Sequence, residues 1–282
     1  MIKILSDSTS DLSKDLLEEY GIDIIPLHIL LGNEEYEDGE GITPDEIYAW
    51  SDKNDTTPKT SAPSMEKVAD ILSRYREYDD IIIFVISEEM SSSGNICRLA
   101  AEELGMEDKV HVVDSRSLST GIGLLILKAC SMVREGKSCD EILSAVSRAI
   151  PYVRASFVVD TLVYLHRGGR CSGLAAMAGA VLKLHPRINV KEGRMLPGKK
   201  YRGHLLRVIK EYENDLKEEL LKAEKDHVFI THSGCDDGTV MEVRSYLESL
   251  GHFESIHITR AGGVISSHCG PGTLGILFIS ER

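Results

Sequence analysis

Small hydroxyl and imidazole side chains recur in this sequence at the ends of short apolar runs. The run IKIL leads into Ser6, the run DIIIFVIS leads into a serine cluster at residues 91–93, and His268 lies in a similar polar group before the last run. In an alternating α/β chain such runs predict buried parallel strands, and ligands bind in the crevice outside the carboxyl ends of those strands. We therefore expect a crevice lined by neutral hydrogen-bonding groups.

Residues 60–64 (TSAPS) place hydroxyl groups immediately before a predicted helix that Ser64 caps. Unpaired backbone N–H groups and the positive end of the helix dipole favour an anion at such a position. Helix capping alone explains Ser64 well but explains Thr60 poorly. The pattern leaves both capping and ligand binding open as roles for Thr60.

A serine turn at residues 90–95 (MSSSGN) follows the most apolar predicted strand and precedes a helix. This turn matches neither the dinucleotide pattern G-x-G-x-x-G nor the phosphate-loop pattern G-x-x-x-x-G-K-[ST]. Its hydroxyl and backbone N–H groups can still hold one small anionic group, so Ser91 and Ser92 are candidate ligands for a carboxylate. An ordinary strand-to-helix turn is the alternative.

His268 lies in the segment SSHCG, and no acidic residue adjoins it in the sequence to orient its ring. We therefore predict that His268 serves as a hydrogen-bond donor rather than as a general base. A purely structural histidine is the alternative. Residues 160–170 end in a glycine pair that permits close backbone approach, followed by the rigid guanidinium of Arg170. Arg170 is thus a further candidate for contact with an anion.

A basic island covers residues 183–207, which hold eight lysines and arginines against one acid, Glu192. The whole chain is acidic, with a formal net charge of -13, so nucleic acid or an anionic membrane surface is not expected as the main partner. The island predicts contact with an anionic protein or a phosphate group. A solvated rim of the protein is the alternative.

The composition is that of a folded protein, since 42% of the 282 residues are apolar. This length favours two α/β lobes with a groove between them. The apolar start of the chain is far too short for a signal peptide, and no segment approaches the ~20 apolar residues of a membrane helix. We expect a cytoplasmic protein without stable membrane insertion, whose six cysteines, free of any C-x-x-C pair, are reduced thiols.

Ile- and Val-rich runs predict strands at residues 2–5, 22–30, 81–86, 109–113, 155–160, 186–191, 227–231, 254–259 and 274–279. Helices are predicted at residues 14–20, 44–50, 65–76, 95–104, 117–135, 139–150, 173–184, 203–224 and 237–250. The expected N-caps are Ser13, Thr43, Ser64 and Ser138. Residues 32–43 and 51–61 are predicted as polar loops. The alternation favours parallel sheets, and a boundary near Pro151 predicts domains 1–151 and 152–282.

No metal site and no cofactor are expected. The sequence has no H-E-x-x-H motif, no paired-cysteine knuckle and no EF-hand loop. Asp7 and Asp11 offer only a weak case for a hard cation.

Five ordered motifs resemble those of the DegV family: SDSTSDL at 6–12, TSAPS at 60–64, the serine turn at 91–94, DTLVYLHRGGR at 160–170 and HCGPGTLGILF at 268–278. The match is collinear over nearly the whole chain. It implies a Rossmann-like N-terminal domain with a parallel sheet and a layered C-terminal domain with a mixed sheet. It also implies a long-chain fatty acid bound between them, with its carboxylate at a polar end and its acyl tail buried. Where a fatty acid kinase is present, such proteins resemble its FakB subunit, which presents the acid for phosphorylation to an acyl phosphate.

The resemblance also implies roles for individual residues. Thr60 and Ser91 match carboxylate-binding residues of the family, and His268 matches the histidine beside the head group. Arg170 matches the arginine of the G-G-R motif. Arg202 matches a family arginine that is implicated in contact with the kinase. Two segments depart from the family pattern: the usual L-S-G-T is MSSS at 90–93, and the usual K-P-I-L is HPRI at 185–188.

A carrier function is physically reasonable. Each buried methylene contributes about 0.8 kcal/mol, so a tail of ~15 methylenes offers roughly 12 kcal/mol against an association cost of several kcal/mol. We also consider a serine acyl hydrolase that uses Ser91 or Ser92 with His268, although no G-x-S-x-G elbow or evident triad acid is present. A phosphosugar or nucleotide binder is a third interpretation, disfavoured because the serine turn is not a phosphate loop.

Overall fold

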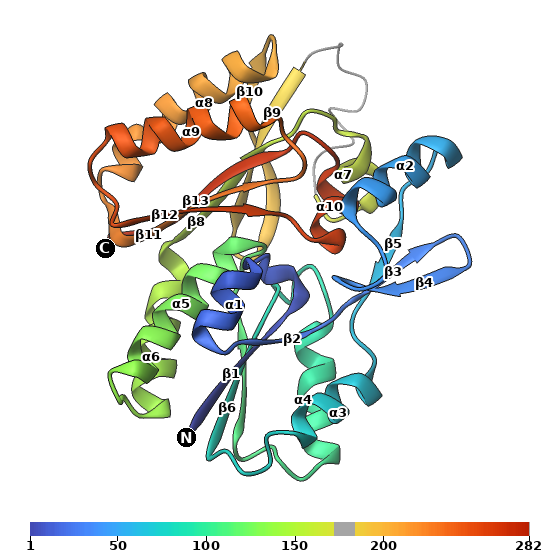
Figure 1. Ribbon diagram of the computed structural model, residues 1–282, viewed down its shortest axis with the longest axis vertical. Coiled ribbons are helices and arrows are strands. Elements are labelled where there is room, and N and C mark those ends of the chain that lie inside the picture. The colour runs from blue at the N-terminus through green and yellow to red at the C-terminus, as the bar shows by residue number, and fades with distance from the viewer. Residues whose placement is uncertain (172–183, 282) are drawn as a thin grey trace.

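The computed structural model describes residues 1–171 and 184–281, and it has the predicted α/β architecture (Figure 1). Within these residues the strands form three sheets: a parallel sheet in the N-terminal part, a mixed sheet in the C-terminal part and a small antiparallel sheet beside them. The helix predicted at 173–184 lies outside the described residues, except for Leu184, which belongs to a strand.

The parallel sheet has the strand order β2-β1-β6-β7. Its strands are β1 (Ile2–Asp7), β2 (Asp23–Ile25), β6 (Asp80–Val85) and β7 (Val110–Asp114). Helices cover both faces, which is why β6 is an uninterrupted apolar run. Ile81 and Ile83 belong to the core that includes α3 (Met65–Ser73) and α4 (Ser93–Glu103), whereas Phe84 belongs to the core that includes α5 (Thr120–Arg134).

The predicted N-caps are confirmed. Ser13 caps α1 (Lys14–Tyr20), Ser64 caps α3, and capping boxes begin α2 (Pro44–Asn54) and α6 (Cys139–Ala149). The helix predicted to begin at Asn95 or a nearby residue is α4, which begins at Ser93, whereas the start of α5 was misplaced, because α5 begins at Thr120 rather than at residue 117. Neither helix has a side-chain cap, so the sequence gives no local signal for where it begins.

The mixed sheet has the strand order β10-β9-β8-β13-β11-β12, and within it only β11 and β12 pair in parallel among the described strands. Its strands are β8 (Val153–Val158), β9 (Leu184–Lys191), β10 (Arg194–Arg202), β11 (Ala223–His232), β12 (Ser255–Arg260) and β13 (Leu274–Ser280). Helices α8 (Leu205–Leu220) and α9 (Asp237–Ser249) cover one face (Figure 1). Helix α5 packs against β8, β11 and β13, so one apolar core joins the two large sheets.

The small antiparallel sheet corrects three sequence predictions. The single strand predicted at 22–30 is divided into β2 and β3 (His28–Leu31), and the predicted loops at 32–43 and 51–61 contain β4 (Glu34–Glu37) and β5 (Lys59–Ser61). These strands are short, and β4 and β5 are mostly polar and partly exposed. They lack the apolar alternation on which strand prediction depends.

Two short helices, α7 (Val163–Gly168) and α10 (Gly263–Cys269), were also not predicted. The predicted domain boundary lies within the 3₁₀ turn η2 (Ile150–Tyr152), between α6 and β8, and it stays a prediction. Among the described residues, every helix is too short or too polar to cross a membrane.

Candidate functional site

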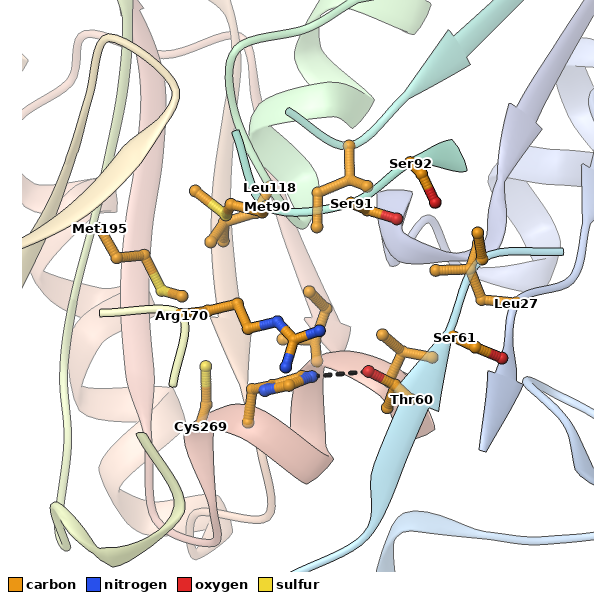
Figure 2. Close-up of a pocket in the computed structure, with 15 residues that line it drawn as sticks. Leu27, Thr60, Ser61, Met90, Ser91, Ser92, Leu118, Arg170, Met195 and Cys269 are labelled. Carbon is orange, nitrogen blue, oxygen red and sulfur yellow. Dashed lines mark hydrogen bonds between the residues drawn. The ribbon is translucent and has the colours of Figure 1, made fainter. Parts of the chain in front are cut away.

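A pocket of about 370 Å³ lies where the carboxyl end of β6, the strand β5 and the helix α10 meet (Figure 2). Its polar lining is Thr60, Ser61, Ser91, Ser92, Arg170 and His268. Its remaining lining is Leu27, Ala62, Ile86, Met90, Leu118, Met195, Val264, Ile265 and Cys269. The sequence indicated six candidate binding residues, and five of them line this one pocket: Thr60, Ser91, Ser92, Arg170 and His268.

Thr60 and His268 make direct contact although 208 positions separate them in the chain. Thr60 Oγ1 and His268 Nε2 are 2.8 Å apart, within hydrogen-bond distance (Figure 2). Ser64, by contrast, accepts a hydrogen bond from the backbone N–H of Lys67. The two roles left open for this segment are thus divided between two residues: Ser64 caps α3, and Thr60 faces the pocket.

The imidazole of His268 is half-buried and electrically neutral. Burial lowers its pKa to about 4, and the positive charge of Arg170 lowers it further in the same direction. Its second nitrogen, Nδ1, is buried without a hydrogen-bond partner among the described residues. A Cβ at Gly168 would lie 2.4 Å from this Nδ1, so the first glycine of the G-G-R segment is needed for the backbone to pass the ring.

The serine turn presents two hydroxyl groups with different surroundings. Ser91 is half-buried, and its Oγ accepts the backbone N–H of Ser93 at 3.2 Å, which leaves its own proton free to donate. Ser92 is exposed at the start of α4 and makes no side-chain capping bond. Figure 2 shows the Arg170 guanidinium directed into the space between Ser91 and Thr60.

Two buried carboxyl groups hold α10, and hence His268, in place. Asp11 accepts the backbone N–H of Gly262 at 2.8 Å, and Asp38 accepts that of Gly263 at 2.8 Å. Burial raises the pKa of Asp11 to about 8 and that of Asp38 to about 6. These hydrogen bonds supply the capping that the sequence around α10 lacks, since Gly262 has no side chain.

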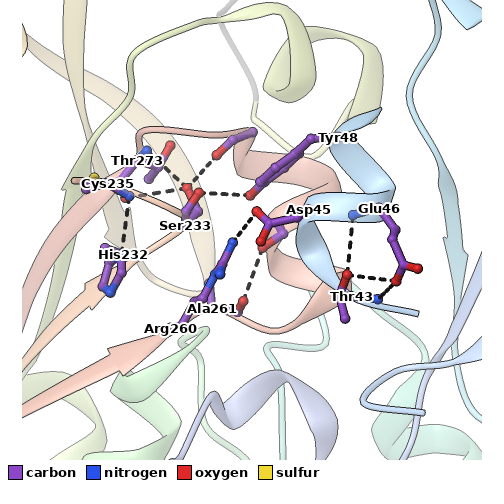
Figure 3. A network of polar contacts seen from close by, with 12 residues as sticks. Thr43, Asp45, Glu46, Tyr48, His232, Ser233, Cys235, Arg260, Ala261 and Thr273 are labelled. Carbon is purple, nitrogen blue, oxygen red and sulfur yellow. Dashed lines mark hydrogen bonds and ion pairs between the residues drawn. The ribbon is translucent and has the colours of Figure 1, made fainter. Parts of the chain in front are cut away.

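Helix α2, which packs against β3 of the small sheet, also makes polar contacts with the C-terminal part of the chain (Figure 3). The Tyr48 hydroxyl donates to the carbonyl of Ser233 at 3.1 Å, and Arg260 pairs with Asp45. Ser233 Oγ in turn accepts the backbone N–H of Thr273 at 3.0 Å. Because Ser233 Oγ also donates to the carbonyl of Gly270, this network connects α2 to the end of α10, the helix that carries His268.

The apolar side of the pocket points toward a second, narrower cavity of about 20 Å³. Both are lined by Leu118, Ile265 and Cys269, and the second is also lined by Phe157 and Leu277 of the mixed sheet. The pocket thus has a polar mouth and an apolar floor that leads inward. A molecule with one charged end and a long hydrocarbon tail fits this division.

The hydrogen-bond pattern disfavours the hydrolase interpretation. The partner of His268 is Thr60 and neither Ser91 nor Ser92. An imidazole with a pKa of about 4 is also a weak base at neutral pH. Residues 270–275 (GPGTLG) fit the spacing G-x-G-x-x-G, but they join a helix to a strand, which is not the context of a dinucleotide loop.

Asp7 and Asp11, which were considered for a hard cation, have structural partners within the protein. Both carboxyl groups are buried and already accept hydrogen bonds, Asp7 from the backbone N–H of Ile86 at 2.9 Å and Asp11 from that of Gly262. The two groups serve to tie chain segments together.

Arg202, the sixth candidate, lies away from the pocket at the exposed end of β10. The described part of the basic island spans the antiparallel pair β9 and β10 and the start of α8. Part of its charge is neutralised, because Arg194 pairs with Glu89 at 2.7 Å and Lys199 pairs with Asp215 at 2.7 Å. Arg202 itself forms no ion pair within the described residues. Lys183 lies outside the described residues.

The segments that depart from the family pattern occupy different environments. His185 is buried within hydrogen-bond distance of the carbonyls of Val159 and Gly203, at 3.2 and 3.1 Å. Arg187 lines a separate cleft, where its guanidinium lies 5.6 Å from the ring of Tyr212. Neither residue lines the pocket.

Several residues that line the pocket were not predicted from the sequence. Leu27 lies between the two strands that were predicted as one, and Met195 lies in β10, which was not predicted. Val264 and Ile265 lie in the unpredicted helix α10. The available signal was the pair Gly262-Gly263 before a short apolar segment.

Comparison with known proteins gives a consistent result. A family model described as "Uncharacterised protein, DegV family" matches residues 1–281. A DegV domain-containing protein of Deinococcus radiodurans is 31% identical over 281 residues, covering 98% of this chain and 97% of that protein. A Thermotoga maritima protein named fatty acid-binding protein is 31% identical, covering 97% and 96%. A structure described as fatty acid binding of a DegV family protein from Thermus thermophilus has a TM-score of 0.91 and 32% identity, covering 99% of each chain.

Proposed function

This chain belongs to the DegV family, and we propose that it is a fatty-acid-binding protein that buries the acyl tail and holds the carboxylate at Thr60 and Ser91. The observation that carries the proposal is the convergence of Thr60, Ser91 and His268, from three distant segments, at the mouth of one pocket with an apolar floor. The fatty acids named for the related proteins support the same ligand class. The tail lies between the two proposed domains, residues 1–151 and 152–282.

The head group is held by hydrogen bonds from neutral groups. With the Nε2–H of His268 donating to Thr60 Oγ1, the Thr60 hydroxyl proton is free to donate to a carboxylate oxygen. Ser91 donates its own proton in the same way, because its oxygen already accepts a backbone N–H. Ser92 is a further donor at the exposed rim, and Arg170 supplies the positive charge that compensates the carboxylate.

The proposal extends to a partner protein. The bound acid is presented to a fatty acid kinase, which phosphorylates its carboxylate to an acyl phosphate, and this chain performs no catalysis itself. The side chain of Arg202 is exposed and forms no ion pair with any residue that the structure describes, which supports a role in contacting that partner. Hydroxyl and imidazole groups suit such a carrier, since they bind a carboxylate without a strong buried ion pair that would resist transfer.

Native mass spectrometry of gently purified protein tests the proposal. We expect a mass increase equal to one long-chain fatty acid per chain, and rebinding of palmitate after delipidation. Protein that is always free of ligand and indifferent to added palmitate would contradict the proposal. Labelling with a fluorophosphonate separates a carrier from a hydrolase, because a serine without an activating base stays unmodified.

A further inference from the structure

Three side chains with metal-ligating atoms converge at the end of the parallel sheet opposite the pocket. Asp80 begins β6, His111 lies in β7, and Cys139 begins α6. One ligand atom from each lies within 4.8 Å of the other two, and among the described residues no other group of three or more such side chains meets this spacing.

This group, which we call the Asp-His-Cys cluster, is well separated from the pocket. β6 has six residues, so a rise of about 3.3 Å per residue puts its two ends roughly 17 Å apart. Asp80 is at the amino end of this strand, whereas Met90 and Ser91 follow its carboxyl end. In Figure 1 the label N marks the amino end of the adjacent β1, far from α10.

The three elements that carry the cluster are firmly anchored. Strands β6 and β7 pair in parallel, with His111 beside Ile82, and the capping box of Ser138 fixes the first turn of α6. His111 Nε2 lies 2.9 Å from Asp80 Oδ1, and the Cys139 thiol lies within 4.8 Å of a ligand atom of each.

We propose that Asp80, His111 and Cys139 bind one divalent transition-metal ion of the Zn²⁺ type. Zn²⁺ takes sulfur, nitrogen and oxygen ligands at about 2.0–2.3 Å in a tetrahedral arrangement, which places the ligand atoms roughly 3.3–3.8 Å apart. A thiolate, a carboxylate and a neutral imidazole carry two negative charges, which balance the charge of the ion. The thiolate selects against Mg²⁺ and Ca²⁺, which prefer oxygen ligands.

The exposure of the cluster leaves room for a fourth ligand from solvent. The side chains of Asp80 and His111 are 29% and 28% exposed, whereas Cys139 is 9% exposed, so the ion enters from the oxygen and nitrogen side. On binding, the Cys139 S–H bond breaks, its proton passes to solvent, and a sulfur–metal bond forms. The hydrogen bond between His111 Nε2 and Asp80 is replaced by two bonds to the ion, and the Nε2 proton is exchanged through solvent for one on Nδ1, so that the imidazole stays neutral.

The sequence does not reveal this site, because its ligands are 31 and 28 positions apart, without any short metal-binding motif. Bound metal would join α6 directly to the first residues of the sheet. We therefore expect the folded state to gain stability from Zn²⁺, independently of fatty acid.

Titration of the chelator-treated full chain with Co²⁺, a spectroscopic probe for zinc sites, tests the proposal. We expect one Co²⁺ per chain, with a thiolate-to-cobalt charge-transfer band in the near ultraviolet that added Zn²⁺ abolishes. Cys139→Ser should remove the band. His111→Ala should weaken Co²⁺ binding by at least about tenfold, since loss of even an outer-shell partner of a metal ligand costs that much.

Cys130→Ser is the matched control, because Cys130 is a buried thiol on α5 outside the cluster, and it should keep the band. Absence of a band in the unaltered protein, or a band that survives Cys139→Ser, would overturn the proposal. Circular dichroism and palmitate binding check that each variant is folded. If Cys139→Ser does not fold, Asp80→Asn and His111→Ala decide the question, and unchanged Co²⁺ affinity in both would refute the site.

Discussion

In the proposed complex, a carboxylate at the mouth of the pocket meets the uncharged ring of His268 and the positive charge of Arg170. Burial and Arg170 keep the pKa of His268 at about 4, so the imidazole donates or accepts hydrogen bonds as a neutral group at physiological pH. Among the described residues that line the pocket, Arg170 is the one cation and no carboxylate is present, and Arg170 itself is exposed. We therefore expect carboxylate binding to depend on directional hydrogen bonds from neutral groups, with solvent-screened help from the charge of Arg170.

The combined substitution Thr60→Ala and Ser91→Ala should weaken fatty-acid binding strongly. Each hydroxyl donates to a charged oxygen, and a hydrogen bond to a charged group contributes about 1.5–3 kcal/mol, so the double variant should lose roughly 100-fold or more in affinity. Isothermal titration of delipidated protein with palmitate measures this.

The matched control is Thr56→Ala with Ser73→Ala, which removes the same two kinds of hydroxyl from exposed positions outside the pocket. The control should bind palmitate as the unaltered protein does. Equal affinity in the folded Thr60/Ser91 variant would remove these residues from the head-group site.

The residues of the candidate site could be predicted from the sequence, but their contact with one another in the folded protein could not. Hydroxyls beyond apolar runs indicated the carboxyl-end crevice, and Ser91 does lie there, after β6. Thr60 instead lies within a strand and His268 within a helix. Their contact across 208 positions depends on tertiary packing, which no local pattern encodes.

At the scale of elements, α10 decides where the imidazole lies. This helix has seven residues and no side-chain cap of its own, so it depends on the carboxyl groups of Asp11 and Asp38 from the N-terminal part of the chain. Such a short helix is marginal by itself. Its position is therefore coupled to the ionisation of two buried acids.

Asp11→Asn should reduce the loss of stability that accompanies a rise in pH. The folded-state pKa of Asp11, about 8, exceeds its unfolded value of about 3.9, so its stabilising contribution is complete below pH 4 and disappears as the pH rises through 8. The pKa of Asp38 is about 6, so most of the stability that depends on its protonation is already lost at pH 6.5.

Urea unfolding of delipidated protein at pH 6.5 and pH 8 measures this difference. The unaltered protein should lose on the order of 1–2 kcal/mol more than Asp11→Asn between these two pH values. An identical pH dependence in the two proteins would show that Asp11 is ionised in the folded state throughout this range.

Elements with their own capping and apolar alternation were predicted, and those without them were not. The capping boxes of α2 and α6 and the apolar run of β6 are local signals, and all three elements were found. Strand β5 is short and polar, and α10 is capped from elsewhere in the chain, so neither has such a signal.

At the scale of the whole molecule, one apolar core joins the parallel sheet to the mixed sheet through α5. The second cavity lies within this junction and shares Leu118 and Ile265 with the pocket. Its volume of about 20 Å³ means that a long tail must displace side chains as it enters. The packing between the sheets should therefore set the acyl length.

Ala261→Leu should shorten the preferred fatty acid. Ala261 lines the second cavity and is buried, so a larger side chain there excludes the end of a long tail. Each excluded methylene costs about 0.8 kcal/mol, so exclusion of two or three should lower stearate affinity by roughly tenfold or more. Laurate affinity should not change. Competition binding with both acids measures the ratio, and an equal effect on both would contradict this placement of the tail.

The alternation of strands and helices was enough to predict an α/β protein, and the resemblance to the DegV family implied the mixed sheet. The alternation alone favours parallel sheets. It gives no sign that most pairings around β8, β9 and β13 are antiparallel. The course of the apolar cavity depends on side chains from both sheets and could not be predicted from the sequence.

A crystal structure with a fatty acid that carries bromine on its terminal carbon tests the central claim most directly. Anomalous scattering locates the bromine, and the density of the chain locates the carboxylate. We expect the bromine between the two large sheets, near Phe157 and Leu277, and the carboxylate within hydrogen-bond distance of Thr60 and Ser91. A bromine at the protein surface, or a carboxylate away from both hydroxyls, would contradict the account.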